Sequence, residues 1–504
     1  MSASSQRPLY LADQVRELDR RTIEAEGDSF ALMRRAGESA YDVLRARWPQ
    51  VRRLCVLCGG GNNGGYGYVV AALAAADGLA VDLVALKPIS ELEGDARKAA
   101  VLAAEAGLEP VDWNDELTLD GELMVDAMLG TGAHGAPRAP YAGAIAEVNA
   151  SGRPVLAIDV PSGVDVDTGH VEADAIKASL TITFIGDKFG LHTGAALDVV
   201  GDIIHASLGI DPQQHGDVVP VAWRQARQDL VAALPPRSPN SHKGAHGHVL
   251  VVAGAPGMGG AALMTSEMVA RVGAGKISLA TDAAHVSASL TRFPEIMARG
   301  VRGASDLEAM VEAADVVAIG PGIGSGAWGQ AALQSVLDAA KPCVLDADAL
   351  NLLARDDSRS RRDDWILTPH PGEAGRLLGI PTAEVQRDRR QAVMALQQRW
   401  GGTIVLKGAG TLVYDGERLT LCPFGNPGMA SGGMGDALTG IIAGLVGQLE
   451  SLGEAARIGV LLHALAADAA AADGGERGLL ATDLASYART LANPQPVSSH
   501  ADHS

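Results

Sequence analysis

Short apolar runs alternate with longer alanine-rich segments along most of the chain. Strands of a parallel sheet are buried on both faces and are connected by helices, so this alternation predicts an α/β fold with parallel sheets. The predicted strands of the first half are Leu54–Leu57, Val81–Leu86, Leu123–Val125, Val155–Ile158 and Leu180–Phe184. Those of the second half are Val249–Ala253, Lys276–Ala280, Val316–Ile319, Cys343–Leu345, Trp365–Leu367 and Thr403–Leu406.

A stretch rich in proline and polar residues, Asp211 to Gly247, interrupts the alternation. Such a composition is typical of a domain boundary, and 504 residues suffice for two domains. We therefore predict a first domain over residues 1–215 and a second over 225–495. The polar end of the chain, residues 493–504, is predicted to be disordered.

Composition narrows the class of protein. Hydrophobic residues make up 47% of the chain and aromatic residues only 4%, so the cores must consist mainly of Ala, Val, Leu and Ile. The net charge of −19 argues against nucleic acid or an anionic membrane as a partner. We see no signal peptide and no apolar run of the ~18 residues that a membrane helix needs. We expect a soluble cytoplasmic protein.

The four cysteines do not predict a disulfide scaffold. Cys55 and Cys58 have CxxC spacing, but they fall within a predicted strand. Residues three apart on a strand face opposite sides of the sheet, so we interpret both as core thiols. His242, His246 and His248 are close in sequence, but we expect them to open a strand and not to bind a metal.

The segment Gly425-Asn-Pro-Gly-Met-Ala-Ser-Gly-Gly-Met-Gly-Asp436 carries the strongest chemical signal. It precedes an apolar helical pattern, Ala437–Leu449, and free backbone N–H groups at a helix start bind anions. An aspartate beside an anion needs a role, and removing a proton from a hydroxyl during phosphoryl transfer is such a role. A glycine-rich helix cap is the alternative, although one glycine would serve for that.

Three loops of the first half follow predicted strands: Gly59–Gly67, Asp126–Gly132 and Asp159–Asp165. Parallel α/β sheets bind ligands at the carboxyl ends of their strands, so side chains from the three loops should converge. Oxygen ligands from Asp, Asn and Ser suit a hard cation better than zinc. Each aspartate taken alone could equally be a turn residue.

These motifs resemble those of the bifunctional NAD(P)H-hydrate repair enzymes over nearly the whole chain. The first half resembles their epimerase domain through Gly61–Gly65, Asp126–Gly132, Asp159–Gly163 and Thr183–Lys188. The second half resembles their dehydratase domain through His242–Gly244, Gly320–Gly324, Asp346–Asn351, Thr368–Glu373, Lys407–Gly408 and Gly425–Asp436. The resemblance implies a Rossmann-like three-layer domain followed by a ribokinase-like α/β domain.

The family repairs NADHX and NADPHX, in which water has added across the C5–C6 bond of the nicotinamide ring. The resemblance implies that the first domain interconverts the R and S forms at C6. It implies that the second domain dehydrates the S form with ADP (or ATP) and magnesium, releasing AMP and phosphate when ADP is used. It also implies a homo-oligomer, tetrameric or larger.

The resemblance assigns residues in both domains. In the dehydratase, Asp436 is the catalytic base, and the hydrated nucleotide is bound by Ala261, Gly324, His370 and Asp436, while ADP or AMP is bound by Lys407, Gly408, Ala409, Gly410, Thr411 and Gly435. In the epimerase, Asp159 and Lys188 are catalytic, and potassium is bound by Asn63, Asp126 and Ser162. The epimerase substrate is bound by Asn62, Asn63, Gly64, Gly65, Tyr66, Gly130, Thr131, Gly132, Ala133, His134, Gly135, Ala136 and Asp159.

Two positions depart from the family pattern. Tyr66 stands where the family usually carries Asp, which removes a carboxylate from the epimerase site. Met434 stands where many members carry Thr, but Asp436 and the glycines beside it are kept. An alternative interpretation is a ribokinase-like small-molecule kinase, whose first domain binds a nucleotide without catalysis.

Overall fold

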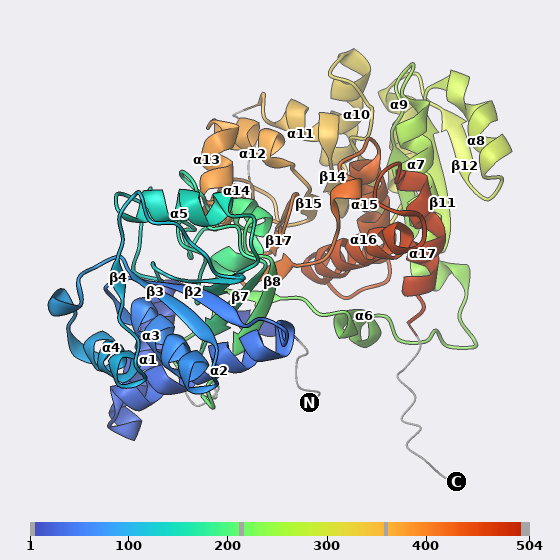
Figure 1. Cartoon of the computed structure of the whole chain (residues 1–504). Coiled ribbons are helices and arrows are strands. Elements are labelled where there is room, and N and C mark those ends of the chain that lie inside the picture. Colours follow the sequence, from blue (N-terminus) through green and yellow to red (C-terminus); the bar gives the residue numbers. More distant parts are fainter. Residues whose placement is uncertain (1–5, 211–215, 357–360, 495–504) are drawn as a thin grey trace, which may run out of the picture. The chain divides into compact units, whose positions relative to one another are not determined.

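The computed structural model describes residues 6–210, 216–356 and 361–494. By their contacts these residues form two compact units, coloured by sequence in Figure 1. The N-unit is Pro8–Ala222, and the C-unit is Trp223 onward together with Gln6 and Arg7. Part of the predicted boundary, 211–215, and most of the predicted disordered end, 495–504, lie outside the described residues.

The described part of the N-unit contains a seven-stranded sheet, and all of its strand pairs are parallel. In spatial order the strands are β4 (Val111–Asp112), β3 (Ala80–Ala85), β2 (Arg53–Cys58), β5 (Leu123–Ala127), β6 (Val155–Ile158), β7 (Leu180–Phe184) and β8 (Asp202–Ala206). The chain runs outward from β2 to β4 and then returns to β5, so the direction of strand order reverses between β2 and β5. Such a reversal opens a crevice at the strand ends where ligands bind.

Helices cover both faces of this sheet. The helices α1 to α4 share one hydrophobic cluster with one face, and α5 shares another with the opposite face. Their bounds are α1 (Ala12–Glu26), α2 (Ser29–Arg47), α3 (Asn62–Ala76), α4 (Gly94–Glu105) and α5 (Tyr141–Ala150). The N-unit is therefore the three-layer Rossmann-like fold that the sequence predicted.

The second sheet, formed mainly by residues of the C-unit, counts 11 strands among the described residues. Their order is β1 (Arg7–Leu9), β9 (Ala222–Arg224), β18 (Leu419–Cys422), β17 (Thr411–Tyr414), β16 (Thr403–Leu406), β15 (Trp365–Leu367), β14 (Cys343–Leu345), β13 (Val316–Ile319), β10 (His248–Val252), β11 (Lys276–Thr281) and β12 (Met297–Gly300). The strands from β16 to β12 are parallel, whereas β17 is antiparallel to both of its neighbours. Strand order reverses between β10 and β13.

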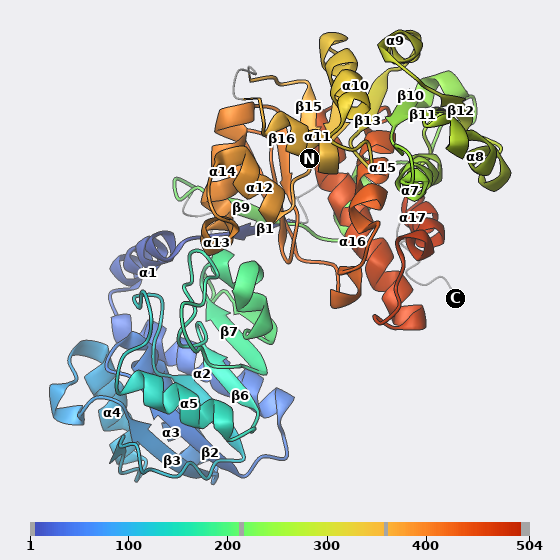
Figure 2. The ribbon, with the colours of Figure 1, turned by 90° about the horizontal axis from the view of Figure 1, so that it is seen from above.

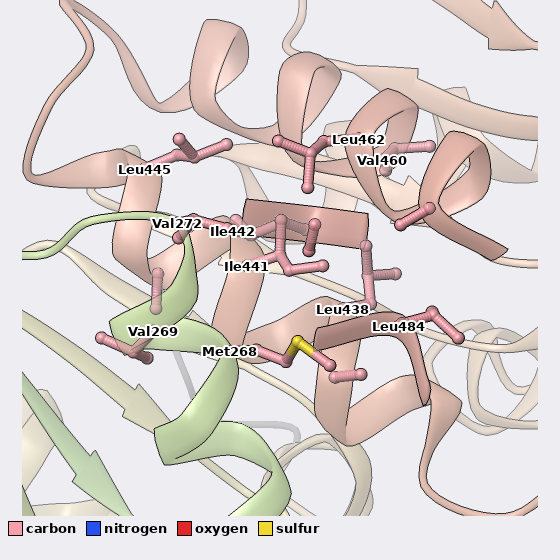
Figure 3. Packing of buried hydrophobic residues seen from close by; sticks show 14 of the residues in the cluster. Met268, Val269, Val272, Leu438, Ile441, Ile442, Leu445, Val460, Leu462 and Leu484 are labelled. Carbon is pink, nitrogen blue, oxygen red and sulfur yellow. The ribbon is translucent and has the colours of Figure 1, made fainter. Parts of the chain in front are cut away.

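One face of this sheet carries the helices that shape the second site. Figure 3 shows Met268 and Val269 of α7, and Val272 directly after it, packed against apolar side chains of α15. The helices of this layer are α7 (Gly259–Arg271), α15 (Met434–Val446), α16 (Leu452–Gly474) and α17 (Leu484–Leu491). Figure 2 shows α12 (Pro371–Leu378) and α14 (Arg389–Trp400) on the other side of the strands.

The remaining helices connect or flank these layers. They are α6 (Gln228–Ala233), α8 (Val286–Arg292), α9 (Ala304–Glu312), α10 (Ala327–Asp338), α11 (Ala347–Leu353) and α13 (Thr382–Arg387). With helices on both faces of a largely parallel sheet, the C-unit has the predicted ribokinase-like architecture.

All four cysteines are buried and free, which confirms their interpretation as core thiols. Cys58 belongs to the cluster under α1 to α4, and Cys55 belongs to the cluster under α5. The two side chains therefore lie on opposite faces of the sheet, as the strand spacing predicted.

The sequence was expected to contain no apolar segment long enough to cross a membrane, and this expectation is wrong. By length and mean hydropathy (1.4), α16 could cross a membrane, because interspersed polar residues such as His463 and Asp468 do not outweigh its alanines and leucines. However, 72% of this apolar window is buried inside the fold, as in the core helix of a globular domain.

Candidate active sites

The first site lies where strand order reverses in the N-unit. Helix α3 begins at Asn62, and the N–H groups of Asn62 to Gly64 in its first turn are available to an anion, whereas the Gly65 N–H donates to the Gly61 carbonyl. A Cβ atom on Gly130 would lie 3.1 Å from the Cβ of Asn63. The loop after β5 therefore meets the first turn of α3, as the resemblance predicted.

Three oxygen-bearing side chains are linked by hydrogen bonds, because Asn63 and Ser162 both bond the backbone of Leu129 and Ser162 bonds Asp126. The fully buried Asp126 accepts hydrogen bonds from the Ser162 hydroxyl (2.7 Å) and the Ser162 N–H (2.8 Å). Burial raises the pKa of Asp126 to about 6, although its hydrogen bonds with Ser162 and Met128 oppose the rise. Asn63 donates its amide to the Leu129 carbonyl (2.8 Å), which leaves its buried Oδ1 without a hydrogen-bond partner.

An unpaired buried oxygen costs free energy unless something fills its coordination. A cation bound at Asn63 Oδ1 would satisfy it, and the carboxylate and hydroxyl nearby are suitable oxygen ligands. The arrangement therefore fits the potassium site implied by the resemblance.

A buried ion pair lies at the ends of β6 and β7. Lys188 Nζ donates to Asp159 Oδ1 (2.6 Å), to the Thr183 hydroxyl (2.9 Å) and to the Phe184 carbonyl (3.0 Å). The backbone of Asp159 is in the left-handed region, at φ 68°, which is uncommon for a residue other than glycine. Such backbone strain is characteristic of functional sites.

Other predicted epimerase residues surround this pair. The ring of Tyr66 meets Phe184 edge-on, with centroids 5.3 Å apart. Burial, followed by the negative charges of Asp19 and Asp159, raises the pKa of the Tyr66 hydroxyl above its usual range. The exposed His134 lies 3.7 Å from Asp165, at the rim of the site.

The second site lies where strand order reverses in the C-unit. The loops after β10 and β13 are hydrogen-bonded to each other, from the Ala255 N–H to the Gly322 carbonyl (2.7 Å). A Cβ on Gly322 would lie 3.4 Å from the Cβ of Ala261. The N–H of Gly324 donates to Asp348 (2.9 Å), beside a cavity of about 540 Å³ that Asp348 and Arg376 help to line.

A buried carboxylate, Asp346, organises the floor of this site. It accepts hydrogen bonds from Lys407 Nζ (2.6 Å) and from the hydroxyls of Thr368 (2.9 Å) and Thr439 (3.0 Å). Burial opposes its ionisation, but the charge of Lys407 prevails and lowers the pKa of Asp346. Burial likewise opposes protonation of Lys407, but Asp346 and Glu373 raise its pKa overall. The pair is therefore charged.

Asp436 lies in the first turn of α15, next to this pair. A Cβ on Gly435 would lie 3.4 Å from both Asp346 Oδ2 and Lys407 Nζ. Burial and repulsion by Asp346 raise the pKa of Asp436 to about 6, against the attraction of Lys407. Asp436 is thus a carboxylate suited to accept a proton near neutral pH, at a helix start that attracts phosphate.

His370 caps α12 in a reciprocal arrangement with Glu373. The Gly372 N–H donates to His370 Nδ1 (3.0 Å), and the His370 N–H donates to Glu373 (2.8 Å). The Nε2 atom of His370 lies 3.4 Å from Glu373 Oε1. Burial, with the positive charge of Lys407, lowers the pKa of His370, so the ring is neutral at physiological pH.

Sequence reasoning missed the residues that support the nucleotide loop. The buried Arg389 of α14 donates to the carbonyls of Leu406 (3.3 Å) and Lys407 (3.2 Å) and reaches that of Gly410 (3.5 Å). The loop between β16 and β17 is thereby held in place. A lone arginine in a helical pattern gives no signal, whereas Asp346, Thr368 and Glu373 lie within motifs of the family resemblance.

A larger cavity, about 1070 Å³, contains none of the predicted site residues. It lies at the ends of α7 and α15 away from the catalytic loops. Among the residues that the structure describes, no three His, Cys, Asp or Glu side chains form a metal-binding group. His248 instead bonds Ala313 and Ser278, consistent with its expected structural role in opening β10.

Comparison with known proteins identifies the family. The chain is 48% identical to the bifunctional NAD(P)H-hydrate repair enzyme Nnr of Coxiella burnetii, over 96% of this chain and 99% of the relative. It is 44% identical to the enzyme of the same name from Escherichia coli K12, over 98% and 96% of the two chains. The chain belongs to the bifunctional NAD(P)H-hydrate repair enzymes.

The two halves match separate family profiles. The family profile described as NAD(P)H-hydrate dehydratase matches residues 249–490, and that described as YjeF-related protein N-terminus matches 29–190. A ribokinase-like superfamily protein from Enterococcus faecalis covers 54% of this chain and 96% of its own, with TM-score 0.50 and 31% identity. The repair enzyme thus joins an NAD(P)HX epimerase domain to an NAD(P)H-hydrate dehydratase domain.

Proposed function

We propose that the dehydratase domain activates the C6 hydroxyl of (S)-NAD(P)HX by phosphorylation with ADP and magnesium. Hydroxide is a poor leaving group, whereas phosphate departs readily. The hydroxyl oxygen attacks the terminal phosphorus of ADP, and the bond to AMP breaks. Phosphate then leaves C6 with the help of the ring-nitrogen electron pair, and loss of a C5 proton gives NAD(P)H.

Asp436 is the base in this proposal, and the assignment rests on its position in the structure. It stands at the start of α15 with a pKa raised to about 6, so it is mostly ionised at neutral pH and accepts the hydroxyl proton. The amides of Gly433 to Gly435 stabilise the transferring phosphoryl group. Lys407 and the loop to Thr411 hold the adenine nucleotide, while Ala261, Gly324 and His370 hold the hydrated nicotinamide nucleotide.

In the epimerase domain, we propose that Asp159 and Lys188 act at C6 of the substrate. The first turn of α3 and the loop Gly130–Ala136 bind the nucleotide part. Potassium bound by Asn63, Asp126 and Ser162 would fix the loops that carry these groups. The unpaired Oδ1 of Asn63 supports this cation site. The family resemblance further supports a cytoplasmic location and a homo-oligomeric state. Light scattering on the purified protein tests the oligomeric state.

Asp436→Asn tests the dehydratase assignment. The variant should lose at least ~100-fold in turnover of (S)-NADHX with ADP, because general-base catalysis contributes about that much. In the parent enzyme the rate should fall about tenfold per pH unit below pH 6, where Asp436 becomes protonated. Absorbance at 340 nm measures both effects.

The matched control is Asp338→Asn, which changes an exposed aspartate at the end of α10. It should leave the rate unchanged. Wild-type turnover by Asp436→Asn, or a parent rate that does not decline below pH 6, would show that another group takes the proton.

A further inference from the structure

We propose that Asp19, on α1, is a second acid–base residue of the epimerase site and acts together with Asp159. This inference rests on the proposed assignment of Asp159 and Lys188 to that site. Neither the motifs nor the family resemblance singled out Asp19, because it stands in an ordinary amphipathic helix. The argument comes from what α1 contacts.

Tyr10, two residues before α1, is joined to the segment that carries Lys188. The Tyr10 N–H donates to the Asp187 carbonyl (2.9 Å), and the Phe189 N–H donates to the Tyr10 carbonyl (3.0 Å). Val15, in the first turns of α1, packs against the same segment, because a Cβ on Gly186 would lie 2.9 Å from its Cγ2. Helix α1 is thus fixed against the lysine of the ion pair.

Asp19 follows Val15 by four residues and therefore lies on the same face of α1, one turn further along. Arg16, three residues before Asp19, donates to the Thr131 carbonyl in the substrate loop (3.4 Å). Helix α1 therefore contacts both the Lys188 segment and the loop that binds the nucleotide, through residues three and four positions before Asp19. A carboxylate at this place borders the site from the side of α1.

The charges of the site agree with this placement. The pKa of Asp19 is influenced by two charged groups, Lys188 after β7 and Asp159 after β6. Asp19 in turn helps to raise the pKa of Tyr66 on α3. Burial raises the pKa of Asp19 to about 6; Lys188 opposes the rise and Asp159 adds to it. Asp159 is paired with Lys188 at 2.6 Å, so the site offers one carboxylate held in an ion pair and one that readily carries a proton.

Epimerisation at C6 needs both an acid and a base. The C6–O bond breaks as a proton is supplied to the departing oxygen, and the electron pair of the ring nitrogen forms a C=N bond. Water then adds to the other face of C6 and gives up a proton, so the exchange is balanced and involves no oxidant or reductant. Two carboxyl groups in different protonation states can perform the two proton transfers.

Asp19→Asn and Asp19→Glu test the proposal in the full chain. Epimerase activity is followed as the conversion of (R)-NADHX into the S form by chromatography, with spontaneous conversion subtracted. We expect Asp19→Asn to lose at least ~100-fold in rate. The parent profile should decline above pH 6 as Asp19 loses its proton; the Asn variant should lack this decline, and the Glu variant should keep it.

Two controls separate this role from a structural one. Dehydratase activity with ADP, measured on the same variant, reports whether the C-unit is folded, and the thermal unfolding of the variant, compared with that of the parent, reports on the N-unit that carries Asp19. Glu24→Gln changes a carboxylate on α1 that pairs with Arg20 at the surface and should leave epimerisation unchanged.

Each failure has a distinct meaning. An Asp19→Asn enzyme with a rate near the parent's, or with a lower rate but the same decline above pH 6, would overturn the proposal. Full activity of Asp159→Asn would instead overturn the site on which the proposal rests.

Discussion

At the scale of single residues, both sites depend on buried polar groups that need charged or hydrogen-bonding neighbours to stabilise them. Asp346 remains ionised although it is almost fully buried, because Lys407, Thr368 and Thr439 surround it. A buried carboxylate deprived of its cation destabilises a fold by several kcal/mol, on the order of 3–5. The negative charge of Asp346 in turn raises the pKa of Asp436, so this pair also sets the proton affinity of the proposed base.

Asn63→Leu tests the cation site of the epimerase. The substitution removes the unpaired Oδ1, so the stimulation of epimerisation by potassium should be lost and the rate at saturating salt should fall roughly tenfold or more. The measurement is the epimerase rate against potassium chloride, with sodium chloride keeping the ionic strength constant. Dehydratase activity of the same variant should not change; potassium dependence like that of the parent would contradict the site.

Residues in glycine-rich loops could be predicted from sequence, because the glycines mark the loop and a predicted strand or a helix start borders it. Asp436, Asn63 and Asp159 all stand in such loops or in the first helical turn after them. Partners that meet from distant segments could not be predicted in this way. Lys407 follows Asp346 by 61 residues and Thr439 follows it by 93, and no local pattern brings them together.

At the scale of elements, α15 joins catalysis to the hydrophobic core. It is preceded by the capping residue Gly433, whose φ of 90° suits glycine, and its first turn presents Asp436. Its apolar side packs against α7 and α16 (Figure 3). A shift of α15 would therefore displace the base and the phosphoryl-binding amides together.

Gly440→Ala tests this coupling. A Cβ on Gly440 would lie 2.2 Å from the Thr265 carbonyl of α7, so the two helices must separate. Overpacking of this kind costs about 1–3 kcal/mol, which should lower both the midpoint of urea unfolding and the dehydratase rate. In Gly474→Ala the new methyl group meets nothing within 4 Å, and both quantities should be unaffected or slightly raised. A Gly440→Ala enzyme with the unfolding midpoint and the dehydratase rate of the parent would show that the contact between α7 and α15 does not couple packing to catalysis.

The strands of both sheets were predictable where they are buried and parallel. Val155–Ile158, Val316–Ile319 and Thr403–Leu406 occur as predicted, because strands covered on both faces are apolar throughout. The hairpin of β17 and β18 was missed because its short strands mix apolar and polar residues next to a conspicuous loop. The edge strands β4, β8 and β12 carry exposed side chains and gave no apolar run.

At the scale of the whole molecule, one chain carries two complementary activities. The dehydratase is specific for one epimer, so a mixture of R and S forms can be restored completely only if the other epimer is converted. The charge of −19 confers solubility. By the family resemblance, Tyr66 replaces a carboxylate, but in our proposals Asp159 and Asp19 remain to move protons at C6.

The most direct test of this account is the recovery of absorbance at 340 nm from an R/S mixture of NADHX after addition of purified protein, magnesium and ADP. We predict complete recovery of NADH, faster than spontaneous epimerisation allows. Fast recovery of the S fraction alone would contradict the activity of the epimerase domain. No recovery with either ADP or ATP would contradict the repair function and favour a ribokinase-like small-molecule kinase.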